Sequence, residues 1–99
     1  MTTKKTPAWL TLAADRVTVT LSRPTELNGV QTDKISLRSP TVRDIRAAGA
    51  TGGDDDEQRE LNLFASLAEV GAKDLEGMAL KDYTRLQTAY FRLVQDDDV

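Results

Sequence analysis

The first third of the chain alternates apolar and polar residues, which is typical of β-strands. Val17, Val19 and Leu21 alternate with polar neighbours, so this stretch predicts a half-buried strand that ends at Pro24. The short apolar patch at 9–12, which contains Trp9, has two interpretations. It is either an edge strand before the first strand or an adhesive N-terminal tail.

A tight turn follows the first strand. Asn28-Gly29 is a pair that tolerates the positive φ angles of a hairpin turn. A second strand is then predicted over about 30–38. Val30 and Ile35 fall on opposite faces of a regular strand, which predicts a bulge or an irregular start. Residues 16–38 therefore read as a β-hairpin.

Helical spacing begins after Pro40. Thr41 is a favourable N-cap, and Asp44 is placed to complete a capping box. A first helix is predicted over about 42–48, with Gly49 as its end.

The second predicted helix is apolar on most sides. It spans about 57–70 and ends at Gly71. One strip contains Phe64, and a second contains Leu63 and Leu67. A helix of this kind is buried on most sides, and in a small domain part of its surface can face a partner.

After a single helical turn near 72–78, a third helix is predicted over about 80–94. Its apolar residues recur at heptad-like spacing, which favours packing against the domain's own core. A second strip beside this seam is predicted to be exposed and to bind a partner. The seam consists of Tyr83, Leu86, Tyr90 and Leu93, and the second strip of Phe91 and Val94. The predicted partner-binding residues are Phe91, Val94, Tyr90, Leu63 and Leu67.

Together these elements predict an α+β fold in which a β-hairpin, with or without a third edge strand, precedes three α-helices. Residues 1–15 are predicted to be a flexible tail or edge strand, 16–95 a single domain, and 96–99 an acidic tail. A chain of 99 residues leaves little room for a deep substrate cleft.

Composition narrows the possible chemistry. The chain contains no Cys and no His, so thiolate ligands, disulfides and the commonest general base are missing. The acids at 54–57 lack the spacing of a calcium loop and suit the start of a helix. We expect no catalytic, cofactor or metal site. No stretch resembles a signal peptide or a membrane span, so we expect a cytoplasmic protein.

Charge is unevenly distributed along the chain. Residues 1–53 carry eight Lys or Arg and four Asp or Glu, whereas residues 54–99 carry five and twelve. The halves either attract each other or offer two surfaces of opposite sign. Arg43 and Arg46 share a face of the first helix, which keeps a DNA-binding regulator as an alternative. The acidic second half, however, lacks the cations that DNA phosphates require.

The order of these signals carries a family resemblance. It consists of Asn28-Gly29, the step Leu37-Arg38-Ser39-Pro40-Thr41 into a helix, an acid-led apolar helix, and Asp82-Tyr83 at the start of the last helix. Over about 16–94 the chain resembles the tail assembly chaperones of contractile-tailed phages and related prophages. Its longer N-terminal segment and Gly77 depart from that pattern.

The resemblance implies a non-enzymatic protein that covers the tape measure protein in the host cell cytoplasm until tail tube subunits assemble. The tail tube protein is a further implied partner. The wide apolar faces of the last two helices also suit a second copy of the chain. Nucleic acid and membrane are not expected partners. A structural tail component is the other alternative function.

Overall fold

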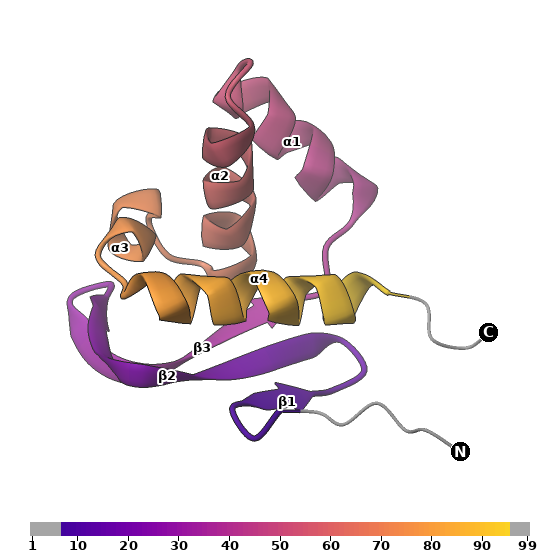
Figure 1. Cartoon of the computed structure of the whole chain (residues 1–99). Helices are drawn as coiled ribbons and strands as arrows, with labels where there is room; N and C mark the ends of the chain where they lie inside the picture. Colours follow the sequence, from indigo (N-terminus) through magenta and orange to yellow (C-terminus); the bar gives the residue numbers. More distant parts are fainter. Residues whose placement is uncertain (1–6, 96–99) are drawn as a thin grey trace.

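A three-stranded antiparallel sheet is followed by four helices in the computed structural model, which describes residues 7–95. The predicted acidic tail at 96–99 and the first six residues lie outside the described residues. The α+β prediction is confirmed (Figure 1). The elements are β1 (Leu10–Leu12), β2 (Arg16–Leu27), β3 (Val30–Arg38), α1 (Val42–Gly52), α2 (Asp56–Ala68), α3 (Ala72–Glu76) and α4 (Leu80–Val94).

The hairpin forms as its pattern predicts. Asn28 and Gly29 both adopt positive φ angles, 54° and 80°, at the turn between β2 and β3. Val17 and Val19 point inward and are completely buried, opposite Leu37 and Ile35 of β3. This alternation gives the sheet one apolar face, and the helices cover that face (Figure 1).

The structure decides between the two interpretations of the N-terminal apolar patch. β1 pairs antiparallel with β2, placing Leu10 opposite Val19, and Leu10 is buried. The guanidinium of Arg85 on α4 lies 5.3 Å from the ring centroid of Trp9. Most of the patch is therefore an edge strand, and Trp9, which precedes it, contacts α4.

Pro24 does not end the first strand as predicted. β2 continues through it to Leu27, and the pairing with β3 shifts register between Thr20 and Thr25. β1 pairs only with residues 17–19 of β2, so Pro24 has no neighbouring strand on that side. Proline is tolerated there because no ladder hydrogen bond requires its missing N–H.

The irregularity predicted at the start of the second strand lies instead in β2. Four β2 residues stand opposite the single residue Asp33 of β3 where the register shifts. β3 is regular, and Val30 is simply exposed while Ile35 is buried. The predicted irregularity assumed that Val30 and Ile35 are both core residues, but only Ile35 is buried.

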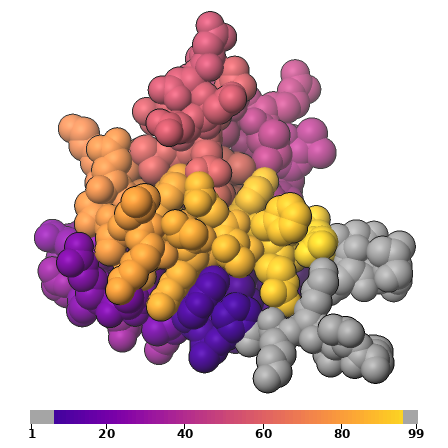
Figure 2. Space-filling model, viewed as in Figure 1, coloured from indigo at the N-terminus to yellow at the C-terminus, as the bar shows by residue number. Residues whose placement is uncertain are grey.

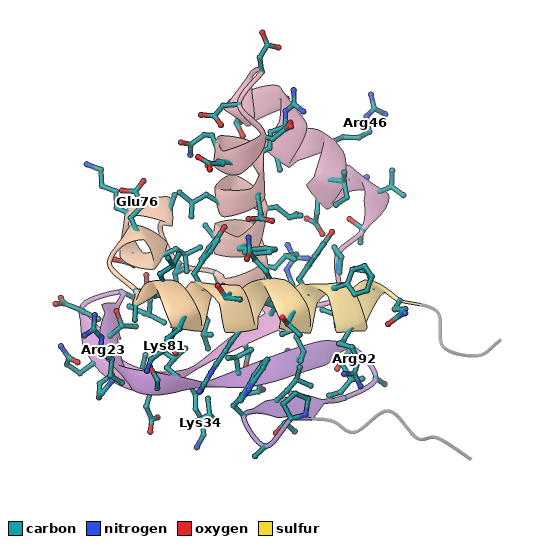
Figure 3. All side chains as sticks on the ribbon, viewed as in Figure 1. Arg23, Lys34, Arg46, Glu76, Lys81 and Arg92 are labelled. Atoms are coloured by element: carbon teal, nitrogen blue, oxygen red, sulfur yellow. The ribbon has the colours of Figure 1, made fainter. Side chains whose placement is uncertain are left out.

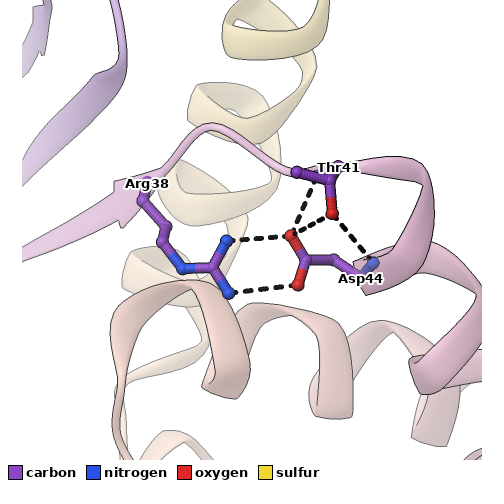
Figure 4. Close-up of polar contacts among 3 residues, drawn as sticks. All are labelled: Arg38, Thr41 and Asp44. Atoms are coloured by element: carbon purple, nitrogen blue, oxygen red, sulfur yellow. Dashed lines mark hydrogen bonds and ion pairs between the residues drawn. The ribbon is translucent and has the colours of Figure 1, made fainter.

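The start of α1 is fixed by a capping box joined to an ion pair (Figure 4). The backbone N–H of Thr41 donates to Asp44 Oδ2 at 2.8 Å, and the backbone N–H of Asp44 donates to Thr41 Oγ1 at 3.2 Å. Both terminal guanidinium nitrogens of Arg38 also donate to the carboxylate, at 2.8 and 3.1 Å. These bonds tie the end of β3 to the first turn of α1.

We expect Asp44→Asn to cost stability at neutral pH but much less in strong acid. The Arg38 guanidinium, followed by the Thr41 backbone, holds the pKa of Asp44 well below its usual range. A carboxyl group with a lowered native pKa stabilises the fold above its unfolded pKa of about 3.9, and this contribution is lost as the pH falls toward the native pKa.

Urea unfolding at a series of pH values measures this difference, with Asp33→Asn on exposed β3 as the control. The gap between wild type and Asp44→Asn should begin to narrow below about pH 4 and keep narrowing as the pH falls toward the native pKa. A gap of constant size down to strongly acidic pH would contradict the assignment.

α1 is longer than predicted. It passes Gly49 and ends at Gly52, with Gly53 at φ 62° as the residue that stops it. A Cβ on Gly52 would lie 2.9 Å from the backbone nitrogen of Arg59. The glycine at 52 thus permits the close approach of α1 to α2, whereas Gly49 is an ordinary helical residue that costs about 1 kcal/mol relative to Ala.

The single helical turn predicted near 72–78 is present as the five-residue helix α3. α2 ends at Ala68, because Glu69 adopts a left-handed conformation at φ 61°. Gly71 then precedes α3 rather than ending α2. A five-residue helix gives too short a pattern for periodicity to separate it from a turn.

One core joins the sheet to the helices. α4 lies along β2 and α2 contacts β3, while α1 packs against α2 (Figure 1). Of the predicted α4 seam, Leu86 is fully buried, and Tyr83, Tyr90 and Leu93 are partly buried against the core. The largest fully buried side chains are Phe64, Leu37, Leu67, Leu75, Leu86, Val17, Val19 and Asp82.

Candidate partner-binding site

Exposed apolar side chains gather on α1 and on the last turns of α4. Phe91 is 63% exposed and Val94 46% exposed, which confirms their predicted exposure. On α1, Val42 and Ile45 are also exposed. Their role in binding a partner remains a prediction.

A groove separates these two helices, and we term it the α1 groove. It has a volume of about 400 Å³. Ile45, Ala48 and Gly49 form its α1 wall, Tyr90 its α4 wall, and Leu63 and Phe64 its floor on α2. Figure 2 shows α4 as a ledge across the front, with α2 and α1 rising above it. The groove is apolar except where Arg59 and Glu60 line it.

The other predicted partner residues differ in exposure. Leu67 is 2% exposed and belongs to the core, so it offers no surface to a partner. Leu63 is also buried, although it lines the floor of the α1 groove. Tyr90 is partly buried, and its ring centroid lies 5.2 Å from that of Phe64. α2 is therefore apolar on several sides mainly because β3, α1 and α3 surround it.

Sequence reasoning missed the contribution of α1. Val42 and Ile45 stand three residues apart, which places them on one face of a helix. That spacing is a usable signal of an apolar face, although the arginines at 43 and 46 give the same helix a basic face. The structure brings this face opposite Tyr90 across the α1 groove.

A second groove lies on the other side of α2, between α3 and α4, and we term it the α3 groove. Its volume is about 530 Å³. Its apolar lining residues are Leu61, Leu75, Met78, Leu80 and Tyr83. Its polar lining residues are Glu57, Glu60, Glu76 and Gln87. Leu80 stands at the rim and is 80% exposed.

Glu60 lines both grooves and is held in place by α4. Tyr83 Oη and Gln87 Nε2 each donate to Glu60 Oε1 at 2.9 Å. Burial, followed by the hydrogen bond to Glu60, raises the pKa of Tyr83, and burial raises that of Tyr90. Both phenols therefore stay neutral at physiological pH, and Tyr83 acts as a donor.

Asp82 lies in the first turn of α4, but its side chain does not cap the helix. Ala79 is the N-cap residue of α4, and it makes no side-chain capping bond. Asp82 is 1% exposed, and its carboxylate accepts bonds from Ser22 N at 2.8 Å and Ser22 Oγ at 3.0 Å. It therefore holds the irregular part of β2 against α4, which keeps the α4 wall of both grooves in place.

The cations of α4 are poorly placed for DNA. Arg85 donates to the backbone oxygen of Thr20 at 2.8 Å as well as contacting Trp9. Lys81 and Arg92 lie along the lower side of α4, toward the sheet (Figure 3). Arg46 lies on the outer side of α1, away from them (Figure 3). These cations do not form one continuous basic stripe.

The described residues contain little that suits other chemistry. Within residues 7–95, no group of three or more Asp or Glu side chains is arranged to hold a metal ion. None of the helices in that range is both long and apolar enough to cross a membrane. The acids at the start of α2 act in capping, since Asp55 Oδ1 accepts from the N–H groups of Glu57 and Gln58.

Comparison with known families gives a match over residues 18–95, from β2 to just beyond α4. The matching family is described as phage tail assembly chaperone proteins, E, or 41 or 14. Comparisons with curated proteins and with solved structures gave no match. Since the matched span covers most of the chain and includes both grooves, the chain belongs to the phage tail assembly chaperone family.

Proposed function

We propose that the chain binds the tape measure protein through the α1 groove and keeps it covered until tail tube subunits replace it. The observation that carries this proposal is an apolar groove between α1 and α4, two helices that also carry exposed apolar side chains. Grooves of this kind accept the apolar face of an amphipathic helix.

The groove also suits a temporary complex. Only a few large exposed side chains are available as anchors: Ile45 lines the groove, and Phe91 follows the lining residue Tyr90 on α4. A small interface of this kind gives modest affinity, which lets a growing tube displace the chaperone. We place this binding, which requires no catalysis, in the host cell cytoplasm.

Co-expression with the tape measure protein of the same phage tests the proposal. We expect the two proteins to co-purify, and we expect more tape measure protein to remain in the supernatant than when it is expressed alone. Tape measure protein that stays insoluble, or that purifies without the chaperone, would contradict the proposal. Co-purification with tail tube protein alone would instead favour a structural tail component.

Phe91→Ala should leave folding nearly unchanged but weaken the complex with the tape measure protein. Phe91 is largely exposed, so its removal creates no core cavity, whereas aromatic anchors commonly supply about 2 kcal/mol or more of binding energy. Thermal melting reports the fold, and quantitative co-purification reports the complex.

Val30→Ala provides the matched control. Val30 has the same exposed fraction as Phe91, 63%, but lies at the hairpin turn, whereas Phe91 is next to the groove-lining residue Tyr90. Equal binding by both variants would place the interface elsewhere. Unfolding of Phe91→Ala would make Phe91 a core residue.

A further inference from the structure

The α3 groove combines an apolar lining with carboxylates that have no ion-pair partner among residues 7–95. These carboxylates belong to Glu57, Glu60 and Glu76, which line the groove. Among the described residues, no Lys or Arg lines this groove. Lys81, for example, lies on the lower side of α4 (Figure 3). Glu76 projects from α3 on the upper side (Figure 3).

We infer that the α3 groove receives a helical segment of the tape measure protein whose apolar stripe is bordered by Lys or Arg. The inference rests on the proposed function and names the chemistry of the partner at this end of the site. Leu80 and Leu61 offer apolar contacts, while the carboxylates of Glu57 and Glu76 are placed to form ion pairs with cationic side chains of the partner. Lys and Arg suit such a site because their long stems lie on apolar surface while their charged ends reach the carboxylates.

Glu60 lines both grooves, which lie on opposite sides of α2. The two grooves differ in charge, because Arg59 lines the α1 groove, whereas Glu57 and Glu76 line the α3 groove. This difference directs basic side chains of the partner to the α3 groove rather than to the α1 groove.

Reversing charge at the α3 groove tests the inference. Glu57→Lys and Glu76→Lys change exposed residues that make no side-chain hydrogen bond within the described chain, and Glu60 is left intact because Tyr83 and Gln87 bond to it. Each reversal should weaken binding of the tape measure protein about two- to fivefold. Asp33→Lys, on β3 and outside both grooves, makes the same charge change and should have little effect.

Affinity is measured with purified proteins at rising ionic strength. Salt should weaken wild-type binding more than that of the Glu57→Lys/Glu76→Lys variant, because screening acts on the charge pairs that the variant has lost. If the variant does not fold, Glu57→Gln/Glu76→Gln removes the same charges without adding cations and should show the same reduced salt dependence.

The outcomes separate the two claims. Binding that is equal in the variant and in Asp33→Lys would overturn the basic-helix inference while leaving the proposed function intact. A wild-type protein that does not bind the tape measure protein at all would overturn both.

Discussion

Phe64→Ala should lower the free energy of unfolding by about 3–5 kcal/mol, because it removes the largest fully buried side chain of the core. The Phe64 ring lies on α2 and contacts both tyrosines of the α4 seam, with centroids 5.7 Å from Tyr83 and 5.2 Å from Tyr90. Because Phe64 forms part of the floor of the α1 groove, its loss leaves a cavity in that floor. Urea unfolding measures the change directly.

Phe91→Ala is the matched control for that experiment, because it makes the same substitution at an exposed site. We expect its free energy of unfolding to stay within about 0.5 kcal/mol of wild type. If Phe64→Ala were as stable as Phe91→Ala, the packing of α2 against α4 described above would be wrong.

Asp82→Ala should cost about 2–3 kcal/mol, more than expected for a residue in the first turn of a helix. The substitution removes two hydrogen bonds to a charged acceptor and leaves the backbone N–H of Ser22 without its partner. It also frees the irregular part of β2 from α4, which is the wall of both grooves.

Ser22→Ala separates the two bonds, because it removes only the hydroxyl donor and keeps the backbone donor. Its cost should be about 1 kcal/mol, clearly below that of Asp82→Ala. Thermal or urea unfolding of both variants tests this order. A smaller effect for Asp82→Ala than for Ser22→Ala would show that the carboxylate does not hold β2.

Much of the fold follows from local patterns. The alternation at Val17 and Val19, the Asn28-Gly29 turn and the Thr41 cap each specify their own structure within a few residues. The errors arose where tertiary context decides. Pro24 stays within a strand because β1 is too short to reach it, and no local signal reveals the length of a neighbouring strand.

The candidate site was only partly predictable for the same reason. The exposure of Phe91 followed from its position beside a regular seam. Leu67 is buried because several elements surround α2. The sequence of a helix alone does not indicate how many other elements pack against it. Asp82 occupies a position that suits a helix cap, and its bond to Ser22 spans sixty residues of sequence.

Site-specific photocrosslinking from position 91 during phage assembly tests the central claim most directly. A photoreactive residue at Phe91 should crosslink to the tape measure protein, while the same residue at Val30 should not. Crosslinks from position 91 to the tail tube protein alone, or to a second copy of the chaperone alone, would contradict the claim that this groove holds the tape measure protein.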